Sequence, residues 1–498
     1  MIKINLNGGI TSPTSLLSIL EIAKRTAVET VSFGARQQLL MSVHKREKIL
    51  FERKMADISL EFETESDQFP NILSSYSTAE IFASTTNEGR NGNALGQNWL
   101  SEGVYLDILN VFDYRPKLKI NICDSGQSHA PFFTGHLNFI SSDVPHFWFL
   151  FVRFPKTNRI ERFPMLVYGQ DLAILAQKIE VALLTVMPFP DDFLEKISLY
   201  TEGVIFRQIE NDLTIPRFVM PYFEGVNTDK TGKMWLGIYR RNEQFSVDFL
   251  IELCQLCQET RVGNIGITAW KTLIIKGIDP KNRFLFEKLL GKHGINVRHG
   301  HIELNWQTED DSPKGFRLKR YLVEQFDAMD VRTFGLVFAI KTRHKSEVFG
   351  SVIIRRHGFF KIGDFDFWGL WGVYDIFYAE DFNPHTRRRR THQLSVPRWR
   401  LASELLNLSK KYFQQLTGEK KALKITAKKT VKVLGETAIL LEIHQCSSCQ
   451  TVYDARFGAL EVGITEGVAF VDLPADFVCP TCDSAKSDFV LVEDVMQI

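Results

Sequence analysis

Four of the seven cysteines stand near the C-terminus, in two pairs with two residues inside each pair: Cys446 with Cys449, and Cys479 with Cys482. A C-x-x-C turn directs two sulfurs toward one point, and two such turns facing each other form a tetrahedral set of thiolates. Such a set binds zinc or iron. The spacing therefore predicts a metal centre, and it leaves the identity of the metal open.

The stretch between the two cysteine pairs narrows that choice. Between Cys449 and Cys479 lie 29 residues, more than the roughly 15–20 usual in a zinc ribbon. Tyr453 and Asp454 follow the first pair, and the run LPADFVCP leads into the second. With this spacing and these internal residues, segment 435–498 resembles rubredoxin.

The resemblance implies one iron held by the four cysteines and cycling between its ferrous and ferric states. It also implies that Tyr453, Phe470 and Phe477 form an aromatic core that keeps water from the sulfurs. Rubredoxins usually place glycine after each pair, where this chain has Gln450 and Asp483, so its reduction potential stays open. A structural zinc site is the alternative.

The metal centre is preceded by a long body, and the sequence of this body contains an internal repeat. Residues 11–44 align with residues 245–278 at a shift of 234 positions. Ser12 and Ser246 stand at equivalent helix N-caps, and residues 49–52 match 284–287 with one residue inserted. Each copy is expected to form a helix, a strand, a turn, a strand and a second helix, which is an α+β unit used twice.

A second resemblance comes from the turn in each copy, FGARQQLL in the first and ITAWKTLI in the second. It is similar to the turn in the ferredoxin-like half-domains of siroheme nitrite and sulfite reductases. The resemblance implies that an arginine at this turn contacts an acidic tetrapyrrole. Arg36 holds that place, and Lys271 is taken as its counterpart.

These patterns predict an α+β protein of duplicated reductase-like units followed by a rubredoxin domain. We expect a first repeat over residues 1–215 and a second over 216–405. A helix and basic linker should follow over 406–434, and the iron-binding domain over 435–498.

The cysteines of the body depart from the reductase pattern. Siroheme reductases hold a four-iron cluster with C-x5-C and C-x3-C pairs, whereas the body has only Cys123, Cys254 and Cys257. We therefore expect no four-iron cluster, and siroheme is possible but not expected. Cys254 and Cys257 take the places of Leu20 and Ala23 in the other copy, so they are predicted to be core residues.

A basic run, Arg387, Arg388, Arg389 and Arg390, is the other candidate binding site. Guanidinium groups pair with carboxylates and phosphates, so the run is interpreted as an anion or tetrapyrrole contact, or as a solvated face. Nucleic acid is unlikely, because a single run without interleaved aromatic residues is thin support.

The chain's formal charge of +1 is divided unevenly. Residues 435–498 carry eleven acidic and two basic side chains, a net charge of −9, so the preceding 434 residues carry +10. The division predicts that opposite charges dock the acidic domain on the body or steer it to partners. No apolar run approaches the roughly 18 residues of a membrane span, and the N-terminus has no secretory pattern. We expect a cytoplasmic protein without a membrane partner.

The function predicted from these features is electron transfer through a mononuclear iron centre, with no catalytic residues of its own. Its partners would be redox proteins, among them a nitrite or sulfite reductase and an upstream reductase. Two alternatives stay open: a siroheme-binding reductase fed by its own rubredoxin domain, and a docking or assembly protein with a structural metal.

Overall fold

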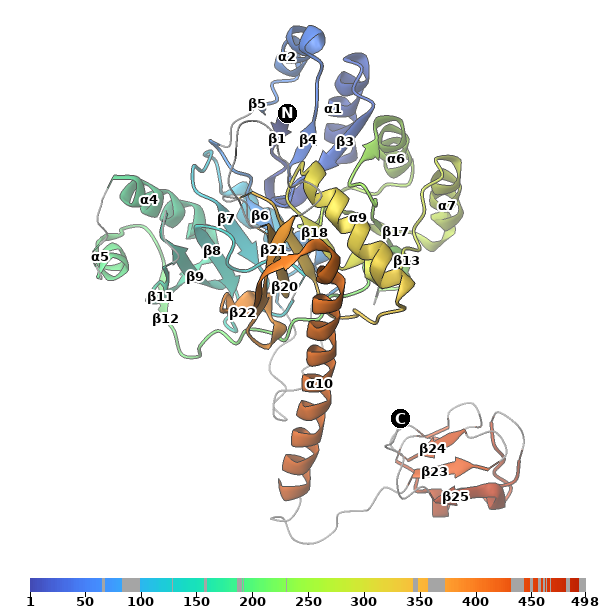
Figure 1. Ribbon diagram of the computed structural model, residues 1–498. Helices are drawn as coiled ribbons and strands as arrows, with labels where there is room; N and C mark the ends of the chain where they lie inside the picture. The colour runs from blue at the N-terminus through green and yellow to red at the C-terminus, as the bar shows by residue number, and fades with distance from the viewer. Residues whose placement is uncertain are drawn as a thin grey trace. The chain divides into compact units, whose positions relative to one another are not determined.

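The computed structural model describes residues 1–64, 68–82, 99–127, 129–155, 159–185, 190, 192–229, 231–343, 348–356, 372–430, 443–447, 451–455, 458–459, 462, 464–465, 467–480 and 484–491, with backbone alone at 200, 418–430 and 443. Two compact units divide the chain, Met1–Gln414 and Gln415–Ile498 (Figure 1). The boundaries predicted at 215, 405 and 434 stay predictions. None of the described helices combines the length and the apolar run needed to cross a membrane.

The first copy opens with a helix whose start is encoded locally. Ser12 caps α1 by accepting a hydrogen bond from the backbone N of Ser15 at 3.0 Å, and Pro13 begins the helix. The apolar side of α1 covers a sheet ordered β15-β3-β4-β1-β5. The bounds are β1 Ile2–Ile4, β3 Thr30–Phe33, β4 Leu39–Met41, β5 Glu63–Thr64, α1 Pro13–Arg25 and α2 Lys48–Asp57.

The second copy repeats this unit. Helix α6, Val247–Glu259, matches α1 position for position at the predicted shift, and α7, Arg283–Lys292, follows α2 with one position more. The shift and the inserted residue predicted from the sequence are thus confirmed. The sheet order is β13-β14-β17-β16-β2. Its own strands are β13 Gly225–Thr228, β14 Met234–Ile238, β16 Ile265–Ile267 and β17 Leu273–Ile278.

The two copies exchange their outer strands. Strand β2, Ile10–Thr11, comes from the first copy but pairs with β16 of the second, and β15, Phe245–Ser246, pairs with β3 of the first. Thr11 faces Ile265 across one pair, and Phe245 faces Val31 across the other. The two contacts are equivalent, because Thr11 corresponds to Phe245 and Ile265 corresponds to Val31 at the shift of 234 positions.

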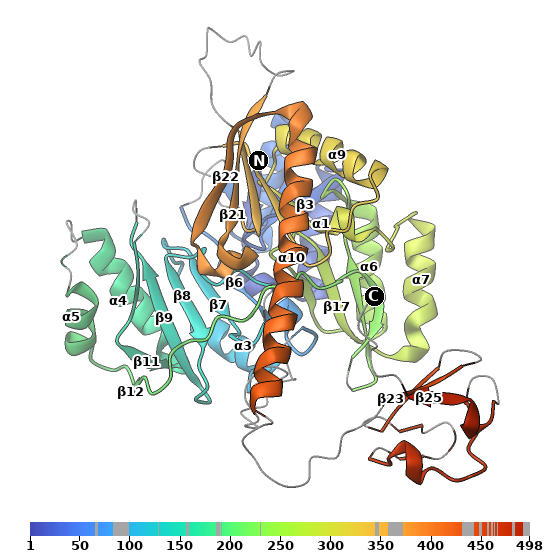
Figure 2. The same ribbon diagram turned by 60° about the horizontal axis from the view of Figure 1, so that its bottom comes forward.

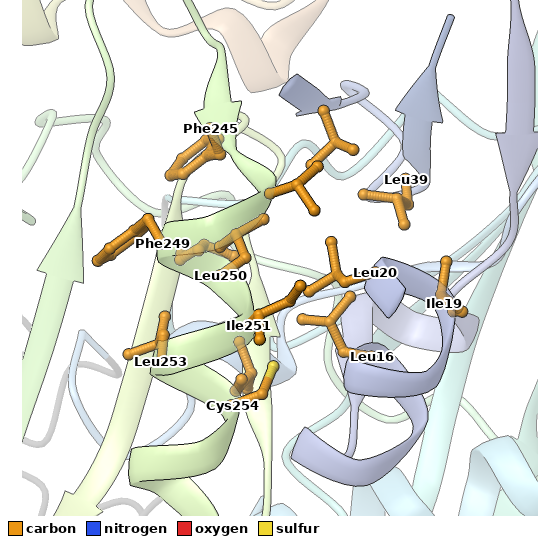
Figure 3. Packing of buried hydrophobic residues seen from close by; sticks show 14 of the residues in the cluster. Leu16, Ile19, Leu20, Leu39, Phe245, Phe249, Leu250, Ile251, Leu253 and Cys254 are labelled. Atoms are coloured by element: carbon orange, nitrogen blue, oxygen red, sulfur yellow. The ribbon is translucent and has the colours of Figure 1, made fainter. Parts of the chain in front are cut away.

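The helices α1 and α6 pack against each other in the same reciprocal way. Lys24 of α1 reaches Asp248 of α6 at 2.7 Å, while Gln258 of α6 donates to Thr14 of α1 at 3.0 Å. In Figure 3 the apolar side chains of the two helices point toward one another. The buried face includes Leu16, Leu20, Leu250 and Cys254.

Each copy continues into a larger mixed sheet. The first is ordered β12-β11-β9-β8-β7-β6 and the second β18-β19-β20-β21-β22. In both, three parallel strands precede an antiparallel one. The bounds are β6 Leu73–Ser74, β7 Ile120–Cys123, β8 Leu137–Ser141, β9 Phe147–Arg153, β10 Ile160–Arg162 (paired with β9), β11 Met165–Tyr168, β12 Phe206–Gln208, β18 Trp306–Thr308, β19 Phe338–Lys341, β20 Val352–Arg356, β21 Val373–Ala379 and β22 Arg389–Pro397.

Helices cover these larger sheets, and Figure 2 shows α4 and α5 beside the first one. Helix α10 starts in the first unit and continues past Gln414 into the second. The bounds are α3 Glu102–Asn110, α4 Leu172–Thr185, α5 Phe193–Tyr200, α8 His301–Leu304, α9 Pro313–Ala328 and α10 Arg398–Thr430.

The body cysteines Cys254 and Cys257 are fully buried in the core around α6, as predicted. Burial raises the pKa of the Cys254 thiol to about 12 and raises that of Cys257 as well. Both therefore pack as neutral apolar side chains.

Candidate metal centre

The C-terminal unit contains a small antiparallel sheet ordered β24-β23-β25. Strand β23, Ile443–Cys446, lies between β24, Val452–Asp454, and β25, Phe489–Leu491. Cys446 pairs with Phe489 across the sheet. The first cysteine of the motif thus ends the central strand, so the sheet fixes the place where its loop begins.

Two loops of the same construction present the cysteines. The backbone N of Cys446 donates to Thr451 O at 2.9 Å, and the backbone N of Cys479 donates to Ser484 O at 2.8 Å. Each bond closes a loop over the same number of residues. Cys446 and Cys479 are both 0% exposed. Their partners in the motif, Cys449 and Cys482, lie outside the described residues, as do Gln450 and Asp483.

Aromatic rings pack beside the two buried cysteines. Cys446 and Cys479 share one core cluster with Tyr453, Phe477 and Phe489, and Phe470 packs against it. The centroid of the Tyr453 ring lies 5.6 Å from that of Phe470. Together the rings form an apolar wall on the side of the thiols, as predicted for three of them.

The hydroxyl of Tyr453 is kept out of this wall's interior, because Oη donates to Val468 O at 2.8 Å. Burial raises the pKa of Tyr453, so the ring stays neutral. His444 stacks on Phe470 with ring centroids 3.9 Å apart and an interplanar angle of 11°. His444 and Phe489 were not predicted from the sequence. Their signal was position: His444 lies two residues before Cys446 on β23, and Phe489 of β25 pairs with Cys446.

The donor set fits a thiophilic metal. Two thiols lie in one dry cluster, each on a residue whose backbone N makes the same kind of bond five residues on, and buried sulfur ligands suit iron or zinc rather than a hard cation. Within the described residues, no group of three or more metal-ligating side chains is complete, because two of the four cysteines lie outside them.

Comparison with known proteins decides the class of this centre. The family profile Rubredoxin matches residues 443–489. Rubredoxin 4 of a Rhodococcus species is 44% identical over 52 residues, which are 10% of this chain and 87% of that protein. The rubredoxin of Megasphaera elsdenii is 40% identical over 53 residues, which are 11% of this chain and all of that protein.

The chain belongs to the rubredoxin family through this C-terminal domain. Rubredoxin-2 of Pseudomonas aeruginosa, 45% identical over 49 residues, is likewise covered over 89% of its length, against 10% of this chain. Since these relatives are covered over nearly their whole length, the C-terminal domain corresponds to a whole rubredoxin. It implies iron binding and electron transfer, which confirms those predictions.

The predicted tetrapyrrole contact Arg36 lies in the body, at the turn between β3 and β4. Its side chain is 9% exposed. Nη2 donates to Asn71 O at 2.7 Å and to Ile120 O at 2.8 Å, and Nη1 to Asn121 Oδ1 at 3.2 Å. Arg36 thus joins the turn to the beginnings of β6 and β7, and its role as an anion contact stays a prediction.

The pairing of Lys271 with Arg36 is wrong. The backbone N of Gln37 bonds to Gly34 O, and that of Lys271 bonds to Thr268 O, so the equivalent residue is Gln37. Lys271 is 2% exposed, and its Nζ lies 2.8 Å from Glu243 Oε2 and 3.2 Å from Asp310 Oδ1. Burial alone would lower the pKa of Lys271, but the two carboxylates raise it above its usual value.

The arginine run lies at the start of β22, the edge strand of its sheet. Arg387 donates from Nη1 to Phe133 O at 2.7 Å. Arg390 lies 2.8 Å and Arg388 3.5 Å from the carboxylate of Glu380. Arg389 is exposed. Residues of the run therefore contact the carboxylate of Glu380 and the backbone carbonyl of Phe133, and a role of the run as an anion site stays a prediction.

A cavity of about 350 Å³ opens beside Arg36, and charged side chains of both signs line it. The acidic ones are the consecutive residues Glu309, Asp310 and Asp311, and the basic ones are Lys3, Arg36, Lys119 and Arg343. The volume lies at the small end of the roughly 300–1,000 Å³ of ligand cavities. The expectation that the body holds no siroheme stays a prediction.

The body nonetheless has a known fold. The structure of the NirA protein of Mycobacterium tuberculosis matches 81% of this chain and 79% of that chain, with a TM-score of 0.56 and 14% sequence identity. This confirms the predicted fold, a duplicated reductase-like body followed by a rubredoxin domain. At such low identity the likeness is one of fold alone.

Proposed function

We propose that the chain is an electron carrier whose iron is held by Cys446, Cys449, Cys479 and Cys482. The observation that carries the proposal is the burial of Cys446 and Cys479 in one aromatic cluster, with equivalent backbone hydrogen bonds from the two residues. Rubredoxin relatives covered over nearly their whole length support it.

The bound iron would supply a one-electron redox couple between its ferric and ferrous states. The chain's own part is to hold the ligands still and dry. The Cys446–Thr451 and Cys479–Ser484 backbone bonds fix the loops, so little rearrangement accompanies the change of charge. Rings such as Phe477 and Phe489 exclude water, and the low dielectric around the sulfurs sets the potential.

We further propose that the body is a docking scaffold that places this carrier beside a nitrite or sulfite reductase, with an upstream reductase as donor. The NirA-like fold supports the choice of pathway. The guanidinium of Arg36, which already donates to the backbone carbonyls of Asn71 and Ile120, supports a scaffold rather than a siroheme enzyme. Buried free thiols at Cys123 and Cys257 support a reducing, cytoplasmic setting.

The visible absorption spectrum and a potentiometric titration of the purified chain test the carrier. We expect a ferric tetrathiolate spectrum that bleaches on one-electron reduction and returns on oxidation. Zinc as the native metal, without a reversible redox couple, would contradict the electron-carrier proposal and favour a structural metal site. An additional heme-like band would instead establish the siroheme-binding alternative.

The docking role is tested by stopped-flow transfer from the reduced chain to the nitrite and sulfite reductases of the same organism. The matched control is the isolated domain, residues 435–498, at equal iron. A scaffold should make the full chain the faster donor by tenfold or more. Equal rates for the full chain and the isolated domain would show that the body does not contribute to the transfer.

A further inference from the structure

The duplication gives the helices and the small sheet of the first copy counterparts in the second, and one cavity differs between the two copies. It measures about 530 Å³ and opens between the first turn of α1, strand β1 and three loops at 59–63, 69–72 and 114–116. It is separate from the cavity beside Arg36 except at Lys3, which lines both.

At two of the lining positions the second copy has large side chains. Ser15, which lines the cavity, corresponds to Phe249, and Asn5 corresponds to Tyr239. Phe249 is fully buried, with its ring centroid 5.5 Å from that of His293. Tyr239 is 4% exposed and lies against His299. At these two positions the second copy thus has buried aromatic rings, whereas the first copy has small polar side chains.

The walls of the cavity are held in place by contacts among the loops. Asn5 Nδ2 donates to Phe69 O at 2.7 Å, and Phe69 N donates to Glu63 Oε1 at 2.8 Å. The guanidinium of Arg115 lies 4.2 Å above the Phe69 ring and pairs with Glu61 at 2.6 Å. These bonds join β1 and the loops, so the cavity is shaped by fixed partners.

The lining offers hydrogen bonds without net charge. Its charged residues are two cations, Lys3 and Arg115, and two anions, Glu61 and Glu63. Hydroxyl and amide side chains and three aromatic rings also line the cavity, and aliphatic side chains and prolines complete its wall. The hydroxyl, amide and aromatic residues are Asn5, Asn7, Thr11, Ser12, Ser15 and Ser59, with Phe62, Phe69 and Tyr114.

One of these groups is unsatisfied. The hydroxyl oxygen of Tyr114 is buried and has no hydrogen-bond partner in the part of the chain that the structure describes. A buried polar atom in this state is costly, and native proteins usually satisfy it with protein, water or a ligand. The Tyr114 side chain lines the cavity, so a turn of this ring would present the oxygen to a bound molecule.

We propose that the cavity is a binding site for an uncharged polyhydroxylated molecule, a sugar ring either free or within a nucleoside. Hydroxyl and amide side chains both donate and accept, which suits ring hydroxyls, and the faces of Phe69 and Tyr114 suit the apolar side of a sugar or a base. Balanced charge on the lining selects against strongly ionic ligands. The site is independent of the proposed electron transfer.

Calorimetric titration of the full iron-loaded chain with adenosine, uridine, D-ribose and D-glucose tests the proposal. We expect saturable binding of at least one probe. Binding of nucleosides alone would identify a nucleoside site, and binding of ribose or glucose a sugar site. Ser15→Phe, which installs the residue of the second copy, should weaken this binding at least tenfold. Ser403→Phe, on an exposed turn of α10, is the matched control and should leave it unchanged.

Because Ser15→Phe adds a large ring, its thermal midpoint is measured beside the wild type, and Tyr114→Phe serves as a second variant that removes only one oxygen. Tyr114→Phe should weaken binding about tenfold and leave the midpoint equal or higher. A wild-type chain that binds none of the four probes would overturn the proposal. Full affinity in both variants would overturn it as well.

Discussion

Gln37 and Lys271 hold the same position in the two copies of one turn, with left-handed backbones at φ 64° and 61°. Gln37 Nε2 donates to Ser74 O, and Lys271 Nζ donates to Thr308 O, both at 2.9 Å, and these two acceptors are again equivalent positions of the two copies. One anchor is thus made by a neutral amide in one copy and by a buried cation in the other.

Replacing Lys271 with the residue of the first copy, glutamine, should leave Glu243 and Asp310 buried without their cation. We expect a loss of about 3–5 kcal/mol in the free energy of unfolding of the body, measured by urea titration. The double variant K271Q/E243Q should recover part of this loss, because one of the two uncompensated charges is gone. A double variant as unstable as the sum of both single changes would contradict the buried-pair account.

His129 makes the body sensitive to acid. It is 1% exposed, neither ring nitrogen has a hydrogen-bond partner among the described residues, and burial lowers its pKa to about 3. The unfolded chain takes up this proton near pH 6.5, so stability is complete above that pH and falls as the pH drops toward 3. Between pH 8 and 4.5 the loss should be about 2–3 kcal/mol.

Replacing His129 with phenylalanine should remove this loss, since the ring already lies among Phe82, Phe223 and Trp270. The thermal midpoint of H129F should exceed that of the wild type more at pH 4.5 than at pH 8. The control is His44→Phe at an exposed position. If H129F and H44F change the pH profile alike, the acid sensitivity has another origin.

Cys446→Ser and Cys479→Ser should each abolish the visible iron band and the cooperative unfolding of the rubredoxin domain, because ligand binding there is largely folding free energy. Cys254→Ala, at a buried body cysteine, should keep the full band. An iron spectrum that survives either serine substitution would show that the ligand set is not the predicted one.

Iron analysis should give about one iron per chain and no acid-labile sulfide, since each rubredoxin centre uses four thiolates and one metal. The prediction rests on the count and spacing of Cys123, Cys254 and Cys257, which match no four-iron pattern. Several irons per chain together with released sulfide would establish a cluster in the body.

Changing Arg388, Arg389 and Arg390 to serine should slow electron transfer at low salt while the iron spectrum stays intact. These exposed cations act through long-range attraction, which is screened beyond about 8 Å at physiological ionic strength. The rate difference from the wild type should therefore shrink as salt rises. A difference that persists unchanged at high salt would indicate a contact role, and no difference at all would indicate a solvated face.

Much of this architecture could be predicted because strong local signals encode it. The caps at Ser12 and Ser246 and the apolar spacing of the following helices fixed the alignment of the two copies, and the cysteine spacing indicated the metal loops. Ring contacts around Tyr453 followed from family resemblance rather than from a pattern that physical rules alone could interpret.

The remaining features depend on contacts between distant segments. Lys271 was matched with Arg36 although the shift of 234 positions pairs it with Gln37, and the hydrogen bonds of the two turns agree with that shift. Strands β2 and β15 have two residues each, too few for an alternating pattern, so their exchange between copies had no signal. The burial of His129 likewise depends on Phe82, Phe223 and Trp270, which come from three distant segments of the chain.

The exchanged strands also constrain how such a chain could have arisen. Each copy leaves an unpaired edge that only the other copy's outer strand completes, and α1 buries its apolar face on α6. Two identical half-length copies could complete each other's edges in the same way. In the single chain the two halves need not be identical, so Gln37 and Lys271 can differ at equivalent positions.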